Sequence, residues 1–410
     1  MKTCKKCCLP EGVVYREDGA ALPSIKVILN VEGICNFCNY YENNPYQPDI
    51  SHPYFLKMLR YSLQNKQKPY DALIGISGGK DGCYVAYDLI KKYNLNILLF
   101  SYQLFQTAEA TKKCDEFAKK LEKRYPNNIT YLPFRRGNYV HEEYYKVFKK
   151  AFLATGLPCS ACTILNIRLS ITDTTLCSIA PLLFSGSSPE QIYGLTHPDG
   201  KSPWLIFFKK DKFNKFDDFR QKLNESLNEQ MLPFFNYNSE EMNIFFNNLK
   251  SLQKEDLIKI ANDEISNTEK RNRLIQAFSE CTYDHNAITP ISYFSFHNYD
   301  EKMIRETLKN ELDYIAPPSH SDCCMNKVIK YIFNQFIPYN TKALEAAAWV
   351  RMGRMSMEEA KPIILNEKNK PYPSSEDMKN FCDFLQITRE DFNATMEKTK
   401  ILLSEFMNTQ

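Results

Sequence analysis

The residues of this sequence with the clearest chemical character form one short glycine-rich stretch, Ser77-Gly78-Gly79-Lys80-Asp81-Gly82. An apolar run at 71–76 precedes it, and residues 82–93 carry apolar side chains at helical spacing. A turn between a strand and a helix presents backbone N–H groups where anions bind. The two consecutive glycines let an anion approach the backbone, Lys80 adds positive charge, and Asp81 is a candidate Mg²⁺ ligand. The stretch therefore predicts a phosphate-binding loop.

The loop is not of the Walker A type, because Ile74 stands where that motif needs its first glycine and Asp81 follows the lysine. It resembles instead the S-G-G-x-D-S signature of the PP-loop ATP pyrophosphatases, and the resemblance covers roughly residues 68–191. This resemblance implies that the loop binds the pyrophosphate end of ATP and that the substrate receives the AMP. Gly82 departs from the family's usual serine. Losing that hydroxyl removes a hydrogen bond typically worth about 1 kcal/mol, so we expect binding to survive and turnover to be equal, weakened or altered.

A second glycine-containing loop, Phe184 to Gln191, follows a later apolar run. PP-loop proteins place a glycine-rich loop that contacts the nucleotide at this point, so the resemblance makes Gly186 a candidate nucleotide-binding residue. The alternative interpretation is an ordinary turn, in which Ser188 caps a helix and Pro189 takes its first position. The two interpretations are compatible.

Two C-x-x-C pairs near the N-terminus have the spacing of metal ligands: Cys4, Cys7, Cys35 and Cys38. Two such pairs supply the four ligands of a tetrahedral metal site. A module as short as residues 1–45 needs a bound metal or a covalent cross-link to fold, so we predict structural Zn²⁺. The surrounding sequence resembles the N-terminus of the N-acetyl sugar amidotransferases, a PP-loop branch that installs amidino groups on bacterial surface sugars.

Residues 349–361 resemble a late helix of the same branch. Arg351 and Arg354 in this segment are candidates to bind a nucleotide-sugar phosphate. The alternative interpretation of the segment is a capped amphipathic helix preceded by basic residues.

A further pair, Cys159 and Cys162, follows the third strand–helix unit. It resembles the C-x-x-C of PP-loop enzymes that thiolate tRNA or small molecules, in which a third cysteine completes a 4Fe-4S cluster. Cys323 or Cys324 could supply that ligand, and the alternative is a pair that packs the domain. The cluster interpretation predicts sulfur–sulfur separations on the order of 4–7 Å between the two groups.

Strands and helices alternate between residues 68 and 199. This order predicts an α/β fold with a doubly wound parallel sheet, which the resemblance identifies as the PP-loop, adenine nucleotide alpha hydrolase-like type, with ligands at the carboxyl ends of the strands. Residues 200–320 lose the alternation and favour a helical insertion. Residues 321–410 favour a helical region that completes the catalytic domain, with helix starts at Ser356 and Ser374.

Composition narrows the classes of function. The chain has 410 residues and a formal net charge of +3, which argues against a nucleic-acid binder over its whole length. No apolar run is long enough to cross a bilayer, and the basic N-terminus lacks the apolar core of a signal peptide. We therefore expect a cytoplasmic protein without a membrane partner. In that reducing compartment the fourteen cysteines favour metal or redox chemistry over disulfides.

The resemblances imply ATP-dependent adenylation of a substrate carbonyl with pyrophosphate release, followed by transfer of nitrogen to a sugar. Lys80 and Asp81 would act on ATP and Mg²⁺, and a separate protein would donate ammonia. The alternative is a sulfurtransferase that uses Cys159, Cys162 and Cys323, with a sulfur-donating partner and tRNA left open as a substrate. A third interpretation, suggested by Gly82, is a non-catalytic ATP-binding scaffold.

Overall fold

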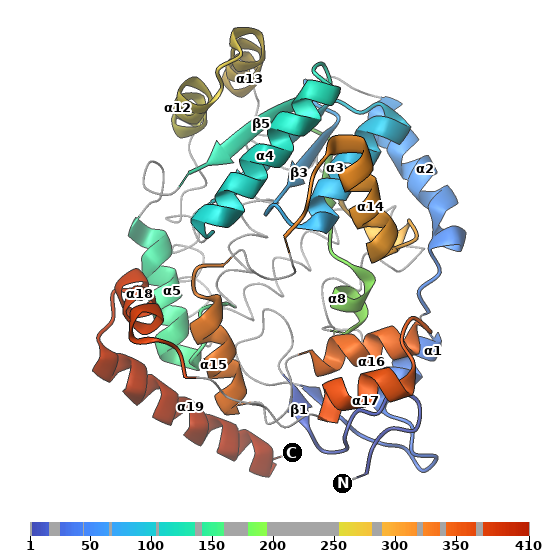
Figure 1. Cartoon of the computed structure of the whole chain (residues 1–410), viewed down its shortest axis with the longest axis vertical. Helices are drawn as coiled ribbons and strands as arrows, with labels where there is room; N and C mark the ends of the chain where they lie inside the picture. The colour runs from blue at the N-terminus through green and yellow to red at the C-terminus, as the bar shows by residue number, and fades with distance from the viewer. Residues whose placement is uncertain are drawn as a thin grey trace.

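A five-stranded, all-parallel sheet forms the centre of the molecule (Figure 1). The computed structural model describes residues 2–15, 25–43, 45–64, 68–103, 106–135, 142–159, 179–194, 254–280, 289–317, 323–336, 342–365 and 372–409. The strands are β3 (Ala72–Gly75), β4 (Ile97–Tyr102), β5 (Ile129–Phe134), β6 (Leu182–Ser185) and β7 (Thr289–Ser292). The first four coincide with the apolar runs of the sequence, and the predicted α/β parallel sheet is confirmed.

The strand order, β5-β4-β3-β6-β7, creates a switch point between two neighbouring strands. From β3 the chain winds outward through β4 to β5, then returns to place β6 on the other side of β3. The loops that leave β3 and β6 therefore depart in opposite directions from one edge of the sheet, which opens a crevice between them. The edge strand β7 pairs with β6 and lies within the range for which the sequence favoured a helical insertion.

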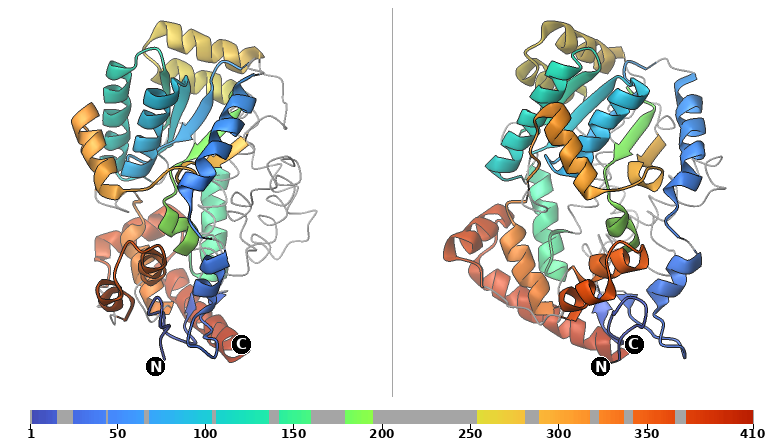
Figure 2. Two further views of the ribbon diagram at one scale, coloured as in Figure 1. Left: turned by 90° about the vertical axis from the view of Figure 1, so that its right-hand side faces the viewer. Right: turned by 45° about the vertical axis from the view of Figure 1, so that its right-hand side comes forward.

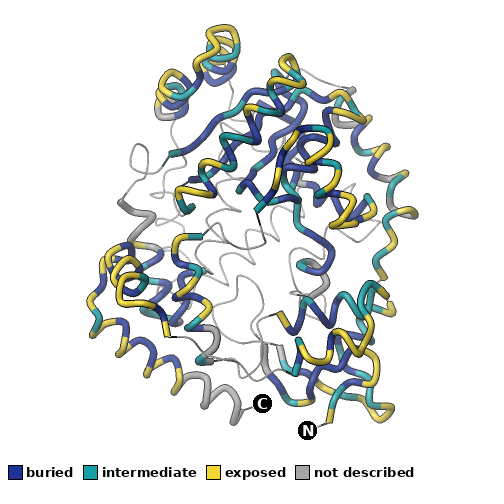
Figure 3. The backbone as a smooth tube through the Cα atoms, viewed as in Figure 1, coloured by how far each residue is buried: buried dark blue, intermediate teal, exposed yellow. Residues whose placement is uncertain are grey.

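Alternating side chains of the strands feed two separate cores, one on each face of the sheet. Ala72 and Ile74 belong to the face that also holds side chains of α2 (Pro48–Gln64), α3 (Lys80–Tyr93), α4 (Ala108–Arg124) and α14 (Glu301–Leu312). Leu73 and Leu98 belong to the opposite face. The apolar cluster on this face includes side chains of α12 (Lys254–Glu264) and α13 (Thr268–Glu280). It continues into α5 (Glu142–Thr155), α15 (Asn326–Phe336), α18 (Ser375–Leu385) and α19 (Arg389–Thr409), which pack against one another below the sheet (Figure 1). Figure 2 shows this layering, and Figure 3 shows the strands and the inward sides of the helices as buried.

The N-terminal segment packs against two helices from the far end of the chain. It comprises the hairpin of β1 (Val14–Tyr15) and β2 (Ile25–Lys26) and the helix α1 (Asn36–Asn43). Its core is shared with α16 (Ala343–Arg351) and α17 (Met357–Leu365). The short helix α8 (Pro189–Gly194) follows β6 and contacts α16, so it lies between the sheet and this third core (Figure 1).

Two predicted helix starts are confirmed by their caps. The hydroxyl of Ser374 accepts a hydrogen bond from the N–H of Asp377 at 3.0 Å. Ser356 and Glu359 form a reciprocal capping box, in which each side chain accepts from the other's backbone N–H. Among the described residues no helix combines the length and apolarity needed to span a membrane.

Candidate functional site

A pocket of about 470 Å³ opens at the switch point, where β3 and β6 end. The loop after β3 and the loop after β6 line one side, and α14 adds Glu301 and Arg305. Helices α16 and α17 and the turn between them line the other side through Lys342, Glu345, Ala346, Trp349, Met355 and Ile363. Every predicted phosphate-loop residue except Gly78 lines this pocket, together with Gly186 from the second loop.

The loop after β3 needs a glycine at position 78, and the loop after β6 needs one at position 186, for steric reasons. Gly78 has a φ of +81°, and a Cβ there would lie 3.0 Å from Cβ of Lys113 and 3.3 Å from the carbonyl oxygen of Ala110 on α4. A Cβ on Gly186 would lie 2.6 Å from the backbone nitrogen of Gly82. The two loops at the switch point therefore touch through backbone atoms, and neither glycine can be replaced without moving one of them.

The start of α3 borders the pocket, and its first N–H groups have no partner within the helix. Gly79 is the residue before the helix, and its extended backbone carries no side chain that could cap the first turn. A bound anion would satisfy those donors, and the helix dipole favours negative charge at the same place. Lys80, almost fully buried in the first turn, adds a cation.

Charged side chains surround Lys80. Its Nζ lies 3.0 Å from Oδ2 of Asp81 and 3.9 Å from Oε2 of Glu301, and Arg305 pairs with the other oxygen of Glu301 at 2.9 Å. Burial raises the pKa of Asp81, and the charge of Lys80 opposes that rise. Three cations and four carboxylates thus meet in one pocket, counting Lys342, Glu190 and Glu345 with those above.

Two carboxylates of the pocket have oxygens that the protein does not satisfy. Among the described residues, neither Oδ1 of Asp81 nor Oε2 of Glu190 has a hydrogen-bond partner, although both atoms are buried. The other oxygen of Glu190 accepts from the hydroxyl of Ser188 at 2.6 Å. Burial raises the pKa of Glu190 to about 7. Mg²⁺ is commonly held by one or two carboxylates together with substrate phosphates, so this donor set fits the cation.

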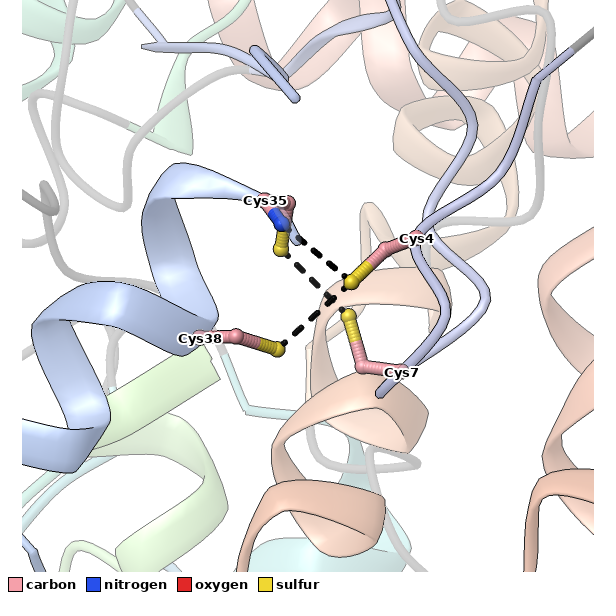
Figure 4. A group of neighbouring side chains, drawn as sticks. All are labelled: Cys4, Cys7, Cys35 and Cys38. Atoms are coloured by element: carbon pink, nitrogen blue, oxygen red, sulfur yellow. Dashed lines mark hydrogen bonds between the residues drawn. The ribbon is translucent and has the colours of Figure 1, made fainter. Parts of the chain in front are cut away.

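The predicted metal ligands at the N-terminus converge (Figure 4). All four sulfurs of Cys4, Cys7, Cys35 and Cys38 are buried and lie within 4.8 Å of one another, with Cys4 to Cys38 at 3.8 Å and Cys7 to Cys35 at 3.5 Å. A tetrahedral zinc ion with Zn–S bonds of about 2.3 Å needs sulfurs about 3.8 Å apart. Hydrogen bonding with Cys35 lowers the pKa of the Cys4 thiol and raises that of Cys7. The residues can therefore hold one metal ion.

The two arginines of the C-terminal segment, Arg351 and Arg354, contact residues outside the pocket. The guanidinium of Arg354 donates to the carbonyl of Tyr299 and, at 3.0 Å, to Oδ1 of Asn298, and it lies over the ring of Trp349. Arg351 lies over the ring of Phe37 at 5.6 Å. Neither belongs to the described residues that line the pocket. Their geometry supports a role in joining elements, and the wall of the pocket comes instead from Lys342, Glu345 and Trp349.

The central cysteines are placed only in part. Cys162 lies outside the described residues, and so does the rest of that segment up to residue 178. Cys159 and Cys323 are half-buried and border the same core cluster. Cys323 also forms a β-bridge with Gln106, whose side chain approaches Cys114 on the helix that backs the phosphate loop. Within the described part of the chain, the four N-terminal cysteines are the one group of three or more close metal-ligand side chains. The three-cysteine cluster therefore stays a prediction.

The chain matches no known protein-family profile, and no curated protein sequence is significantly similar to it. The arguments for its function therefore come from the geometry of the pocket and from the motif resemblances in the sequence.

Proposed function

We propose that the chain is an ATP-dependent enzyme that adenylates a substrate carbonyl oxygen, releases pyrophosphate and then transfers nitrogen to the activated carbon. The observation that carries this proposal is the pocket at the switch point, in which the glycine loops after β3 and β6, Lys80 and two unsatisfied carboxylate oxygens meet. A polyphosphate has the shape and charge that such a group of donors recognises.

In the proposed first step the carbonyl oxygen attacks the α-phosphorus of ATP, and the bond to the leaving pyrophosphate breaks. Lys80 and the N–H groups at the start of α3 would neutralise the charge that develops on the leaving group. Asp81 and Glu190 would hold Mg²⁺, which, when bound, offsets the negative charge of phosphate oxygens. In the second step ammonia attacks the activated carbon, AMP leaves with the former carbonyl oxygen, and the surplus proton passes to solvent.

The nitrogen acceptor is proposed from resemblance together with the shape of the pocket. The segments that resemble N-acetyl sugar amidotransferases, near both ends of the chain, form or back the wall that faces the phosphate loop. Trp349 offers an aromatic surface, and Lys342 and Glu345 offer a cation and a carboxylate. We therefore propose an N-acetylated sugar as the acceptor and a separate protein as the source of ammonia.

The test follows the transferred oxygen. The protein is incubated with MgATP, ammonium chloride and an N-acetylated sugar nucleotide that carries ¹⁸O in its acetyl group, and the products are examined by ³¹P NMR. We expect pyrophosphate and AMP bearing one ¹⁸O. Asp81→Asn and Lys80→Met should each slow the reaction at least about a hundredfold, whereas Lys400→Met on the surface of α19 should leave it unchanged. Products of ADP and phosphate would refute the proposal, and ATP binding without turnover would favour the scaffold interpretation.

A sulfurtransferase is the second candidate, favoured by the position of Cys159 and Cys323 at the border of one core cluster. It requires iron as well as zinc if a cluster carries the sulfur. Anaerobic purification followed by zinc, iron and sulfide analysis separates the two candidates. About one zinc and no iron per chain supports nitrogen transfer, whereas about four iron atoms per chain supports sulfur transfer.

A further inference from the structure

Tyr314 reaches the phosphate loop from behind. It follows α14, after Asp313 has ended that helix in the left-handed conformation with a φ of 51°. Its side chain is buried, and its hydroxyl donates to the carbonyl oxygen of Gly78 at 2.6 Å. The ring packs edge-on against Phe117 of α4, so helix packing fixes where the hydroxyl lies.

The hydrogen bond sets the direction of one peptide group. In a trans peptide the C=O of one residue and the N–H of the next point in opposite directions. The carbonyl of Gly78 points to Tyr314, on the side of α4 and α14, so the N–H of Gly79 points the other way. Gly79 lines the pocket and Gly78 does not, which agrees with this orientation.

The loop cannot hold this peptide by itself. A peptide between two glycines rotates with little steric resistance, because neither residue has a Cβ. A side chain at Gly78 would clash with α4, and Gly79 has no side chain to cap the helix. An external hydrogen bond is therefore the available means of keeping the N–H of Gly79 turned toward the pocket.

We propose that Tyr314 is a positioning residue that holds the Gly78–Gly79 peptide so that the N–H of Gly79 donates to a bound polyphosphate. The inference rests on the proposed function for the identity of the anion, the pyrophosphate end of ATP. It adds a residue far from the glycine motif in sequence that orients the motif without touching the nucleotide.

The test removes the hydroxyl alone. Tyr314→Phe keeps the ring and its contact with Phe117, and Tyr70→Phe is the matched control. Tyr70 is also buried and also donates its hydroxyl, to Thr130 at 3.2 Å, but it precedes β3, at the end of the strand away from the pocket. We expect Tyr314→Phe to weaken the binding of magnesium pyrophosphate about five- to tenfold by calorimetry, while Tyr70→Phe leaves the affinity unchanged.

A spectroscopic measurement distinguishes a positioning role of Tyr314 from a general loss of protein stability. In protein labelled with ¹⁵N-glycine, the amide signal of Gly79 can be assigned with Gly79→Ala, whose Cβ would make only an ordinary contact with Ser77. Pyrophosphate should shift this signal in the wild type and in Tyr70→Phe, and should shift it much less in Tyr314→Phe.

Three outcomes overturn the inference. Wild-type pyrophosphate affinity in Tyr314→Phe would overturn it alone and leave the proposed function standing. Equal losses of affinity in Tyr314→Phe and Tyr70→Phe would show that lost stability explains the effect. If the wild type itself binds neither pyrophosphate nor ATP, the proposed function fails and the inference fails with it.

Discussion

Disrupting the four-cysteine cluster at the N-terminus, which we predict to hold zinc, should disturb the wall of the pocket formed by α16 and α17 and spare the loop after β3. The double variant Cys35→Ser, Cys38→Ser takes away two of the four sulfurs. Structural zinc in short modules contributes apparent binding energies of about 10–16 kcal/mol, which is as large as the stability of a whole domain, so the module should unfold without it. The core that it shares with α16 and α17 then loses one side.

The size of the effect on α16 and α17 follows from what the module covers. Leu344 and Ile364 are 3% and 0% exposed. Uncovering a fully buried side chain of this size costs about 1.5–3 kcal/mol, so the two together cost about 3–6 kcal/mol. Such a loss makes local opening of these helices at least about a hundredfold more frequent. Because α16 carries Lys342, Glu345 and Trp349 at or near its ends, the acceptor side of the pocket should lose its shape.

Hydrogen exchange measured by mass spectrometry tests this reasoning. Amides of residues 2–15, 25–43 and 343–365 should lose protection together in the double variant, while those of β3 to β6 keep theirs. Pyrophosphate affinity should stay within about threefold of the wild type. Cys382→Ser, a buried cysteine on α18 outside the metal site, is the matched control and should change neither region. Protection retained in 343–365 while 2–15 and 25–43 open, or full retention of zinc, would refute the coupling.

The remaining predictions concern the pocket. Gly186→Ala should abolish pyrophosphate binding in calorimetry, because its Cβ would lie 2.6 Å from the backbone nitrogen of Gly82. Gly82→Ser should keep or raise activity, because Gly82 does not have a positive φ and a Cβ there, 3.3 Å from the carbonyl oxygen of Gly75, requires that oxygen to move by only a few tenths of an ångström. Mn²⁺ can be used as a probe of the proposed Mg²⁺ site, with its affinity measured by electron paramagnetic resonance. The affinity should rise about tenfold per pH unit up to the pKa of Glu190, about 7, and then level off, because below that pH the cation must displace one proton from Glu190. Glu190→Gln should bind Mn²⁺ more weakly and with a flatter pH profile, and an unchanged profile would count against Glu190 as a ligand. The same raised pKa means that Glu190 lowers the stability of the protein as the pH rises from about 4.5 to about 7, so Glu190→Gln should reduce the fall in melting temperature over that range.

The central sheet was predictable because each of its first four strands is a short apolar run buried on both faces. A short run of this kind is typical of a strand that is covered on both faces, and segments with the pattern of amphipathic helices separate the four runs. The fifth strand was not predictable on these grounds. Unlike the other strands, β7 (Thr289–Ser292) is no apolar run, because Ile291 is its one aliphatic residue, and it contains Pro290, which a central strand excludes. It is tolerated here because β7 is the edge strand and pairs on one side only.

The candidate site was predictable where one short segment contains the whole signal, as in the phosphate loop and the two C-x-x-C pairs. Glu190 was not identified, although its sequence position held a clue. Asp81 and Glu190 each occupy the first turn of a helix that follows a strand, and those strands turn out to be neighbours at the switch point. Tyr314 had no such clue, because its role depends on α14 packing against α3 and α4, a contact that no local pattern encodes.

The position of Arg354 explains how distant parts of the chain come to share one pocket. Its guanidinium lies over the rings of Tyr46, Trp349 and Tyr299, which belong to the link between α1 and α2, to α16 and to the segment that leads into α14. Its hydrogen bonds to the Tyr299 carbonyl and to Asn298 fix it to that last segment. The planar guanidinium can stack on rings and donate at its edge at the same time, which a lysine cannot do. Tyr299 also lies beside Lys80, with the lysine Nζ 5.9 Å from its ring centre. Arg354 therefore connects the link after α1 and the helix α16, which lines the pocket, to Tyr299 beside Lys80. This connection gives a structural reason for an arginine at this position, although its charge does not face the pocket.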